Sequence, residues 1–425
     1  MKSILLTFIT FLAFTSIAQE IHKCYTHEVM QKQEELTPGY LQSVNEAFYR
    51  AKNEMSHDRS TVHTIPVVVH IVYNNAQENL ADSVIFDQIE RLNEDYRRLN
   101  ADTVNLRDTF QTIVGDSFIQ FELATTDPDG NPTTGITRTS TTHGSFFNFS
   151  SFNAEDVKSS SSGGIDPWNQ QDYLNIWVCD MSVLGSPFIL GYATPPNNLP
   201  HWPPGSADNM SDGVVIQYQA FGSNNPNVVD PGTGPIDFQG RTTAHEVGHY
   251  LGLRHIWGDG DCTAEDGIDD TPNADAQSDQ DCDTTKNTCT DNIGTLGDLP
   301  DMVENYMDYS AETCQNSFTL GQVDMMRSIL ENYRYELING TPAPASINEI
   351  AFEFQMYPNP SNGSVVINGI PEGRNVITVY GETGQQVWNT STVNNQIQID
   401  HLNKGVYFIQ VINDLGTVTK KLVVL

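Results

Sequence analysis

Three histidines and one glutamate stand at a spacing that suits metal chemistry. His245 and His249 are four residues apart, so on a helix both rings lie on one face and can bind the same cation. Gly252 has no Cβ and can adopt a left-handed conformation, and the turn it allows brings His255 round as a third ligand. Three neutral nitrogens leave a fourth position open for water, which is the arrangement of a catalytic zinc site.

Glu246 follows the first histidine directly, where its carboxylate can reach that water rather than the metal. Zinc lowers the pKa of its water to about 7. As general base, Glu246 can take the proton while the water attacks a peptide carbonyl, and then pass it to the leaving amine. Three surface histidines at a helix end are the alternative, but five rare residues at fixed positions seldom coincide. The pattern predicts a zinc-dependent peptidase.

The composition limits the partners. At 425 residues the chain is long enough for two or three folded units. It has 21 Lys and Arg against 54 Asp and Glu, a formal net charge of −33, which argues against nucleic acid or an anionic membrane surface as the main partner. Many acids cluster in Asp259–Asp301 among Gly, Asn and Thr, so this segment is either a solvated loop surface or a site for hard cations.

The N-terminus indicates export. Residues 1–18 have a basic start, a short apolar run and small residues at the end, the pattern of a secretory signal peptide; a buried N-terminal helix is the alternative. The run is too short for a comfortable membrane span, and no later segment is long and apolar enough for one. Export permits disulfides, and four of the six cysteines lie in the acidic segment, where spacing leaves three pairings open. These four are Cys262, Cys282, Cys289 and Cys314.

Apolar periodicity predicts the elements that position the motif. A polar, partly helical segment over residues 19–58 precedes the main domain and is expected to be removable. A strand, a helix and further strands then lead to the motif helix, which indicates an α/β half with a twisted sheet. The expected elements are strands at Ile65–Tyr73, Ser117–Ala124, Asp172–Met181 and Gly213–Tyr218, and helices at Ser83–Leu99, Arg241–Leu251 and Leu320–Glu336.

The C-terminal part reads as a separate unit. Residues 341–349 form a linker by composition, and residues 350–425 alternate β-rich runs with Gly, Asn and Pro turns, which predicts a small sandwich. Without family knowledge this unit is an accessory module, for example a carbohydrate-binding one. Its aromatic residues are either a binding platform or core residues. They are Tyr357, Tyr380, Trp388 and Tyr407.

The zinc motif resembles the signature of the metzincin metallopeptidases, in which a Met-turn follows the third histidine. Asn305–Tyr309 fits that turn: Met307 would form an apolar floor beneath the zinc. Tyr309 resembles the tyrosine that in several metzincins moves between the zinc and the transition-state oxyanion.

More narrowly, the chain resembles the pappalysin family, especially its short, ulilysin-like members, from about Ile65 to Tyr335. The resemblance rests on Ile65–Tyr73, Leu174–Cys179, Ile268–Pro272 and Asn305–Cys314. It implies an α+β fold with a metzincin-type catalytic domain over residues 59–340. That domain would contain a twisted mixed sheet, the active-site helix and an irregular C-terminal subdomain, and a small all-β sandwich would follow it.

The same resemblance implies three further features. The disulfides would be Cys262–Cys289 and Cys282–Cys314. Calcium would bind the acidic loop, and the resemblance also puts an acid beside the Met-turn that selects Arg or Lys after the scissile bond. Glu312 occupies that place, with Ala311 where the family has a second acid, and a solvated loop glutamate is the alternative. The calcium candidates are Asp259, Asp261, Asp266, Asp269 and Asp270.

Cys24 stands just inside the expected mature N-terminus. A thiolate is a good soft ligand for zinc, and we expect Cys24 to occupy the fourth zinc position in a zymogen, as in ulilysin-like enzymes. A cut before Arg59 would release it and would suit a pocket bearing Glu312, so activation would be autolytic. The alternative is a disulfide to Cys179, which by its apolar strand is otherwise expected to be a buried free thiol.

The last unit resembles the type A sorting domains of the type IX secretion system. The resemblance rests on Tyr357–Ser361, Leu402–Phe408 and Lys420–Val424. It implies that the secretion machinery is a partner and that the protein is extracellular or attached to the surface of a Gram-negative bacterium.

A secreted protease made as a zymogen, acting on protein or peptide substrates, is the favoured interpretation. A secreted adhesin or binding module with a structural zinc is the rival, but a structural site needs no base beside its first ligand and usually has four protein ligands. A metallo-amidase is the second rival, against which Met307 and Tyr309 in register weigh.

Overall fold

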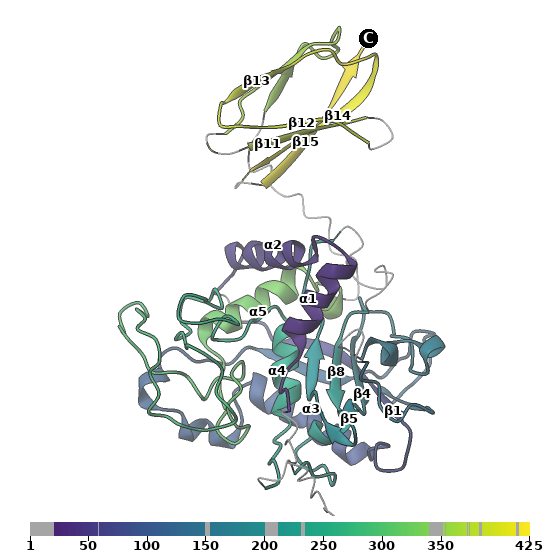
Figure 1. Ribbon diagram of the computed structural model, residues 1–425, viewed down its shortest axis with the longest axis vertical. Coiled ribbons are helices and arrows are strands. Elements are labelled where there is room, and N and C mark those ends of the chain that lie inside the picture. Colours follow the sequence, from purple (N-terminus) through teal and green to yellow (C-terminus); the bar gives the residue numbers. More distant parts are fainter. Residues whose placement is uncertain are drawn as a thin grey trace, which may run out of the picture. The chain divides into compact units, whose positions relative to one another are not determined.

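The computed structural model divides the chain into two compact units, Met1–Pro342 and Ala343–Leu425 (Figure 1). The expected signal peptide and linker, residues 1–18 and 341–349, lie outside the part of the chain that the structure describes. The described residues are 21–57, 59–148, 154–199, 211–230, 234–339, 352, 354–371, 373, 375–381, 385–413 and 416–425.

A six-stranded mixed sheet forms the centre of the first unit, in the order β2-β1-β4-β8-β7 with β3 also paired to β1. All pairs are parallel except the edge pair β7–β8. Strand β4 is buried along its whole length, and five of its six residues, all except Asn175, are apolar. The strands are β1 (His63–Tyr73), β2 (Ile119–Leu123), β3 (Ile136–Ser140), β4 (Leu174–Cys179), β7 (Gly191–Ala193) and β8 (Val214–Gln217). A separate two-stranded ribbon joins β5 (Ser182–Val183) to β6 (Ser186–Pro187).

Helices α3 (Asp82–Tyr96) and α4 (Arg241–Tyr250) are held together: the Tyr96 hydroxyl donates to the Ala244 carbonyl at 3.0 Å. Helix α3 ends three residues earlier than predicted, because Arg98 takes a positive φ of 51°. The predicted last helix is divided into α5 and α6, and Arg334 between them pairs with buried Asp212. The remaining helices of the first unit are α1 (Thr26–Leu36), α2 (Tyr40–Asn53), α5 (Leu320–Asn332) and α6 (Glu336–Asn339). Five short 3₁₀ turns lie at Ala101–Asn105, Asp108–Phe110, Glu155–Lys158, Ser160–Ser162 and Tyr218–Ala220.

The expected pro-segment folds as α1 and α2, which pack on the rest of the first unit (Figure 1). Helix α2 contacts α5, and the Ser328 hydroxyl of α5 donates to the Ala51 carbonyl at 2.7 Å. Between α4 and α5 the chain is irregular, as predicted. Two crosslinks, Cys262–Cys289 and Cys282–Cys314, tie this segment, and they have the pairing that the resemblance implied.

The second unit is a sandwich of two antiparallel sheets, one of three strands (β13-β10-β9) and one of four (β12-β11-β14-β15). Tyr407 is buried in its core and Trp388 packs against that core, whereas Tyr357 is 47% exposed. The strands are β9 (Gln355–Tyr357), β10 (Val365–Asn368), β11 (Asn375–Gly381), β12 (Gln386–Thr392), β13 (Gln396–Ile399), β14 (Gly405–Asn413) and β15 (Gly416–Val424). Across the described ranges of both units, no helix has the length and apolar character needed to cross a bilayer.

Candidate metal centre

The three predicted histidine ligands converge at one point beside α4. Their Nε2 atoms form a nearly equilateral triangle, with His249 3.1 Å from both His245 and His255, and the last two 3.3 Å apart. Ligands arranged tetrahedrally about 2.0 Å from one ion stand about 3.3 Å from each other. All three side chains are buried. The residues present therefore fit a zinc ion.

Each ring is oriented through its second nitrogen, Nδ1, which faces a hydrogen-bond acceptor. The pairs are His245 with Tyr306 O (2.7 Å), His249 with Leu253 O (2.8 Å) and His255 with Asp259 Oδ1 (2.5 Å). An acceptor requires the proton on Nδ1, so the Nε2 lone pair of each neutral ring faces the metal position. Burial lowers the pKa of His249 to about 3 and the pKa of His245 well below its usual value, which keeps both rings neutral.

Two glycines allow the chain to gather these ligands. Gly252 has a φ of +90°, the predicted left-handed conformation, and Ile329 fills the space toward which a Cβ would point. Gly248 faces Met307, whose Sδ would lie only 2.5 Å from a Cβ at this position. The buried Met-turn, which the resemblance implied, therefore packs directly against the histidine helix.

Glu246 is fully buried, and its carboxylate faces the expected pro-segment. Its Oε2 accepts hydrogen bonds from the Thr26 hydroxyl at 3.1 Å and the Cys24 thiol at 3.4 Å. Its Oε1 has no hydrogen-bond partner within the described part of the chain, and lies 2.9 Å from where a Cβ on Gly191 would stand. Burial raises the pKa of Glu246 to about 8, opposed by the bonds from Cys24 and Thr26. Burial therefore disfavours the charged form of this carboxyl in the present form of the protein.

Cys24 lies at the metal position. Its Sγ and the three histidine nitrogens all lie within 4.8 Å of one another, and no second group of three or more such ligands was found among the residues described. Burial, followed by the charge of Glu246, raises the pKa of the Cys24 thiol. Cys24 and Cys179 are both free and buried, so the alternative of a disulfide between them does not hold.

Tyr309 stands beside the ligands. Its ring lies 5.0 Å from that of His255 and 5.7 Å from that of His245, measured between centroids. Its hydroxyl donates to the main-chain carbonyl of Cys24 at 3.1 Å. The expected pro-segment therefore accepts the hydrogen bond of the phenol that the resemblance assigned to the oxyanion.

The residues before α1 pair with the edge of the sheet. His22 forms a parallel bridge with Ile189, and the amide of Tyr25 donates to the carbonyl of Gly191 at 2.9 Å. Gly191 begins the edge strand β7. An extended segment on a sheet edge uses the same main-chain groups that an incoming peptide strand would use.

Lys23, between these paired residues, points into the molecule. Its ammonium donates to the carbonyl of Ser310 at 2.7 Å and to that of Asp308 at 3.3 Å, and the residue is only 4% exposed. Burial lowers the pKa of Lys23 to about 8, and the charges of Glu312 and Asp308 oppose that shift. The ammonium of Lys23 thus fills a space beside the Met-turn that the carbonyl oxygens of Asp308 and Ser310 line. We call this space the Lys23 pocket.

Glu312 is buried, so its alternative as a solvated loop residue is wrong. Its carboxylate caps the N-terminus of α4 by accepting bonds from the amides of Gln239, Arg241 and Thr242, at 2.6, 3.0 and 2.6 Å. The Thr242 hydroxyl donates to it as well. A carboxylate at a helix N-terminus is stabilised by the orphan amides and the helix dipole. Glu312 therefore anchors the metal helix in addition to lending charge to the Lys23 pocket.

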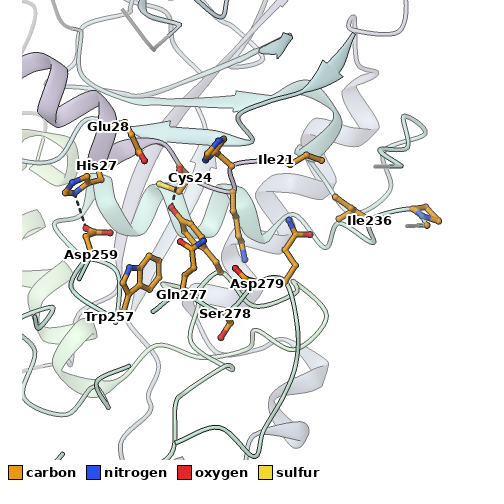
Figure 2. Close-up of a pocket in the computed structure, with 16 residues that line it drawn as sticks. Ile21, Cys24, His27, Glu28, Ile236, Trp257, Asp259, Gln277, Ser278 and Asp279 are labelled. Carbon is orange, nitrogen blue, oxygen red and sulfur yellow. Dashed lines mark hydrogen bonds and ion pairs between the residues drawn. The ribbon is translucent and has the colours of Figure 1, made fainter. Parts of the chain in front are cut away.

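The five calcium candidates are dispersed. Asp259 faces His255, and its other oxygen lies 3.3 Å from Nδ1 of His27 in α1 (Figure 2). Burial would raise the pKa of Asp259, but its hydrogen bonds to His255 and His27 outweigh it and hold that pKa below its usual value. Asp259 is thus a partner of the third zinc ligand.

The other four candidates differ in burial. Asp261 accepts bonds from Thr263 at the surface, and Asp269 is exposed and pairs with Lys52 of α2 at 2.7 Å. Asp266 and Asp270 each retain a buried carboxylate oxygen for which the described residues offer no hydrogen-bond partner. Burial raises the pKa of Asp266 to about 8.

A cleft of about 850 Å³ opens beside Cys24 (Figure 2). The expected pro-segment lines one side of it with His27 and Glu28, and the irregular segment lines the other with Trp257 and Asp279. The fold and this site together define a metzincin-type metallopeptidase domain.

Comparisons with known proteins agree with that class. Residues 222–331 match the family model described as pregnancy-associated plasma protein-A, and residues 355–425 match the secretion system C-terminal sorting domain. A promirolysin mutant of Tannerella forsythia has 38% sequence identity and a TM-score of 0.61, covering 74% of this chain and 97% of that one. Mature mirolysin of the same organism, in complex with a cleaved peptide, has 42% identity and a TM-score of 0.56, covering 66% and 97%.

An extracellular metalloprotease of Arthroderma benhamiae is 33% identical over 174 residues, which are 40% of this chain and 52% of that protein. The chain spans about half the length of the first curated relatives it matches. The chain belongs to the pappalysin family of metallopeptidases and carries a C-terminal secretion sorting domain.

The contact between Gly248 and Met307 gives a stability prediction. Gly248→Ala places a methyl group against the Met307 sulfur, and overpacking of a filled core costs about 1–3 kcal/mol, against a helix-propensity gain of ~1 kcal/mol. We expect a lower unfolding temperature by calorimetry. Gly144→Ala is the control, because no atom lies within 4 Å of its Cβ position.

A second change tests the cause. Met307→Ala should destabilise the Gly248→Ala protein less than it destabilises the parent, since the smaller residue relieves the clash. Equal effects in the two backgrounds would show that Met307 does not press on the helix.

Proposed function

We propose that this protein is a secreted zinc endopeptidase that is synthesised as a zymogen. The observation that carries the proposal is the triangle of His245, His249 and His255 with Glu246 buried one residue from the first ligand. Oε1 of Glu246 is buried and has no hydrogen-bond partner among the described residues, which is costly. A structural zinc in a binding module would not explain this cost, whereas a general base needs a free oxygen.

The residues divide the chemistry between them. A zinc ion bound by the three histidines would polarise the scissile carbonyl and make a water more acidic. Glu246 takes the proton of the attacking water and returns it to the leaving amine. The Tyr309 hydroxyl, once released from the Cys24 carbonyl, donates to the oxygen on which negative charge develops.

We infer a preference for Arg or Lys after the scissile bond. Lys23 supports it, because its ammonium lies between the carbonyls of Ser310 and Asp308 and near the charge of Glu312. Glu312 uses both oxygens to cap α4, so it contributes to this pocket through charge rather than through a free hydrogen-bonding oxygen.

The proposed domain plan is a signal peptide over residues 1–18, a pro-segment over 19–58, the peptidase over 59–340 and a sorting domain over 350–425. The pro-segment is supported by the share of this chain that matches promirolysin, 74%, against 66% for mature mirolysin. Cys24 is proposed as the fourth zinc ligand of the zymogen. The sorting domain implies export by type IX secretion. Asp266 and Asp270 are the favoured calcium ligands, because their unpartnered oxygens need a cation or proton.

Replacing the base should abolish turnover without removing the metal. The pro-segment is first removed from the parent and the variant with the same added protease, which is then inhibited. Glu246→Gln should then lower kcat/KM by about 10²–10⁴-fold. Its zinc content should equal that of the parent. The exposed Glu90→Gln is the matched control. A Glu246→Gln protein that degrades peptides as fast as the parent refutes the mechanism.

A peptide library tests the substrate preference. The matured protein should cut before Arg and Lys, because only these side chains bring a cation to the pocket that holds Lys23. Mass spectrometry of the products should show these cuts without a chelator and their loss when a chelator is added. Metal-dependent cuts spread over all residue types would remove the preference and leave the peptidase proposal intact.

Loss of the thiol tests latency. Cys24→Ala should yield a full-length chain that cleaves peptides before any processing, because the fourth metal position becomes open. Cys179→Ala is the control, being an equally buried free cysteine outside the metal group. Activity is followed alongside the size of the chain on gels. A Cys24→Ala chain that stays latent until cut would exclude the thiol as the switch.

A further inference from the structure

The last turn of α3 is connected to the first zinc ligand through the Met-turn. The Tyr306 hydroxyl donates to Asp95 Oδ1 at 2.8 Å, and the main-chain carbonyl of the same tyrosine accepts the Nδ1 proton of His245 at 2.7 Å. Asp95 is 4% exposed, and Tyr306 and His245 are fully buried. One residue therefore links a buried carboxylate to a metal ligand without touching the metal.

The next residue of α3 holds the other side of the same ligand. The Tyr96 hydroxyl donates to the carbonyl of Ala244, directly before His245, at 3.0 Å. The rings of Tyr96 and Tyr306 both pack against Phe318, with centroids 5.0 and 4.6 Å away. The two main-chain carbonyls beside His245 are those of Ala244 and Tyr306. Helix α3 holds the first directly, through Tyr96, and the second indirectly, through the bond from the Tyr306 hydroxyl to Asp95.

A second contact of Asp95 provides an alternative path. Arg241, the first residue of α4, lies 3.6 Å from Asp95 and 2.8 Å from Asp102. Its guanidinium also lies 5.8 Å from the centroid of the Tyr306 ring. An effect of Asp95 on the metal site could therefore pass through Arg241 and the start of α4, and an experiment must separate the two paths.

We propose that Asp95 is a positioning residue for the metal site, which acts through Tyr306 by fixing the carbonyl that orients the His245 ring. The inference rests on the proposed zinc site. A group that orients a metal-binding histidine typically changes metal affinity by about 10–100-fold when it is removed. Asp95 acts one residue further away, so we place its effect at the lower end of that range, about tenfold.

Zinc affinity of the full-length chain, measured by competition with a chromogenic chelator, tests the proposal. Asp95→Asn and Tyr306→Phe should each weaken zinc binding by about tenfold, and the double variant should be no weaker than the weaker single variant, because both break one path. The visible spectrum of the Co²⁺-substituted chain should shift in both variants, since the ligand field changes with the His245 ring.

Asp102→Asn is the matched control, because it removes the closer partner of Arg241 and leaves the bond between Asp95 and Tyr306 intact. Unchanged zinc affinity in this control supports the path through Tyr306. Equal weakening in Asp95→Asn and Asp102→Asn would overturn it in favour of Arg241, and unchanged affinity in Tyr306→Phe would also overturn it. Tyr306→Phe keeps every charge, so it decides the matter if Asp95→Asn does not fold. A parent that binds no zinc would defeat the proposed function itself.

Discussion

The whole site depends on the fixed orientation of three neutral imidazole rings. Three lone pairs that face one point repel each other and are removed from water, so rings without a constraint would turn away. Each ring is held through Nδ1, and the three acceptors come from the Met-turn, the residue after Gly252 and the carboxylate of Asp259. Helix α4, the irregular segment and α3 therefore all contribute contacts around one metal position.

The expected pro-segment contacts the proposed base, the phenol and the pocket of that site. Thr26 and Cys24 bond the Glu246 carboxylate, the Cys24 carbonyl accepts from Tyr309, and Lys23 fills the pocket beside the Met-turn. The bonding residues fall between Lys23 and Thr26, the first residue of α1, and His22 and Tyr25 beside them pair with the sheet edge. In the proposed zymogen, removal of this one short segment would free the base, the phenol and the pocket together, so latency would need no distortion of the peptidase domain.

The ligands and the base could be predicted because they are local: helical periodicity and one glycine place His245 to His255 without any distant contact. Their supports could not. Asp95, Tyr306 and Lys23 reach the site only through tertiary packing, and no spacing in the sequence relates them to the histidines. The prediction for Asp259 shows the same limit, since an acidic loop identifies a carboxylate but not which partner, a cation or a histidine, it faces.

Buried carboxylates around the site favour a positively charged group beside them. Asp308 is 2% exposed, its Oδ2 lacks a hydrogen-bond partner in the described residues, and burial raises its pKa. A buried anion without compensation costs several kcal/mol, so this carboxylate is stabilised by a proton or a neighbouring cation. The ammonium of Lys23 supplies that cation in the present form, and it donates to the carbonyl of Ser310 and, beside Gln315, to that of Asp308. In the proposed mature enzyme, a lysine or arginine of a substrate would supply the same charge and donors in place of Lys23, which is the physical basis for the proposed basic preference.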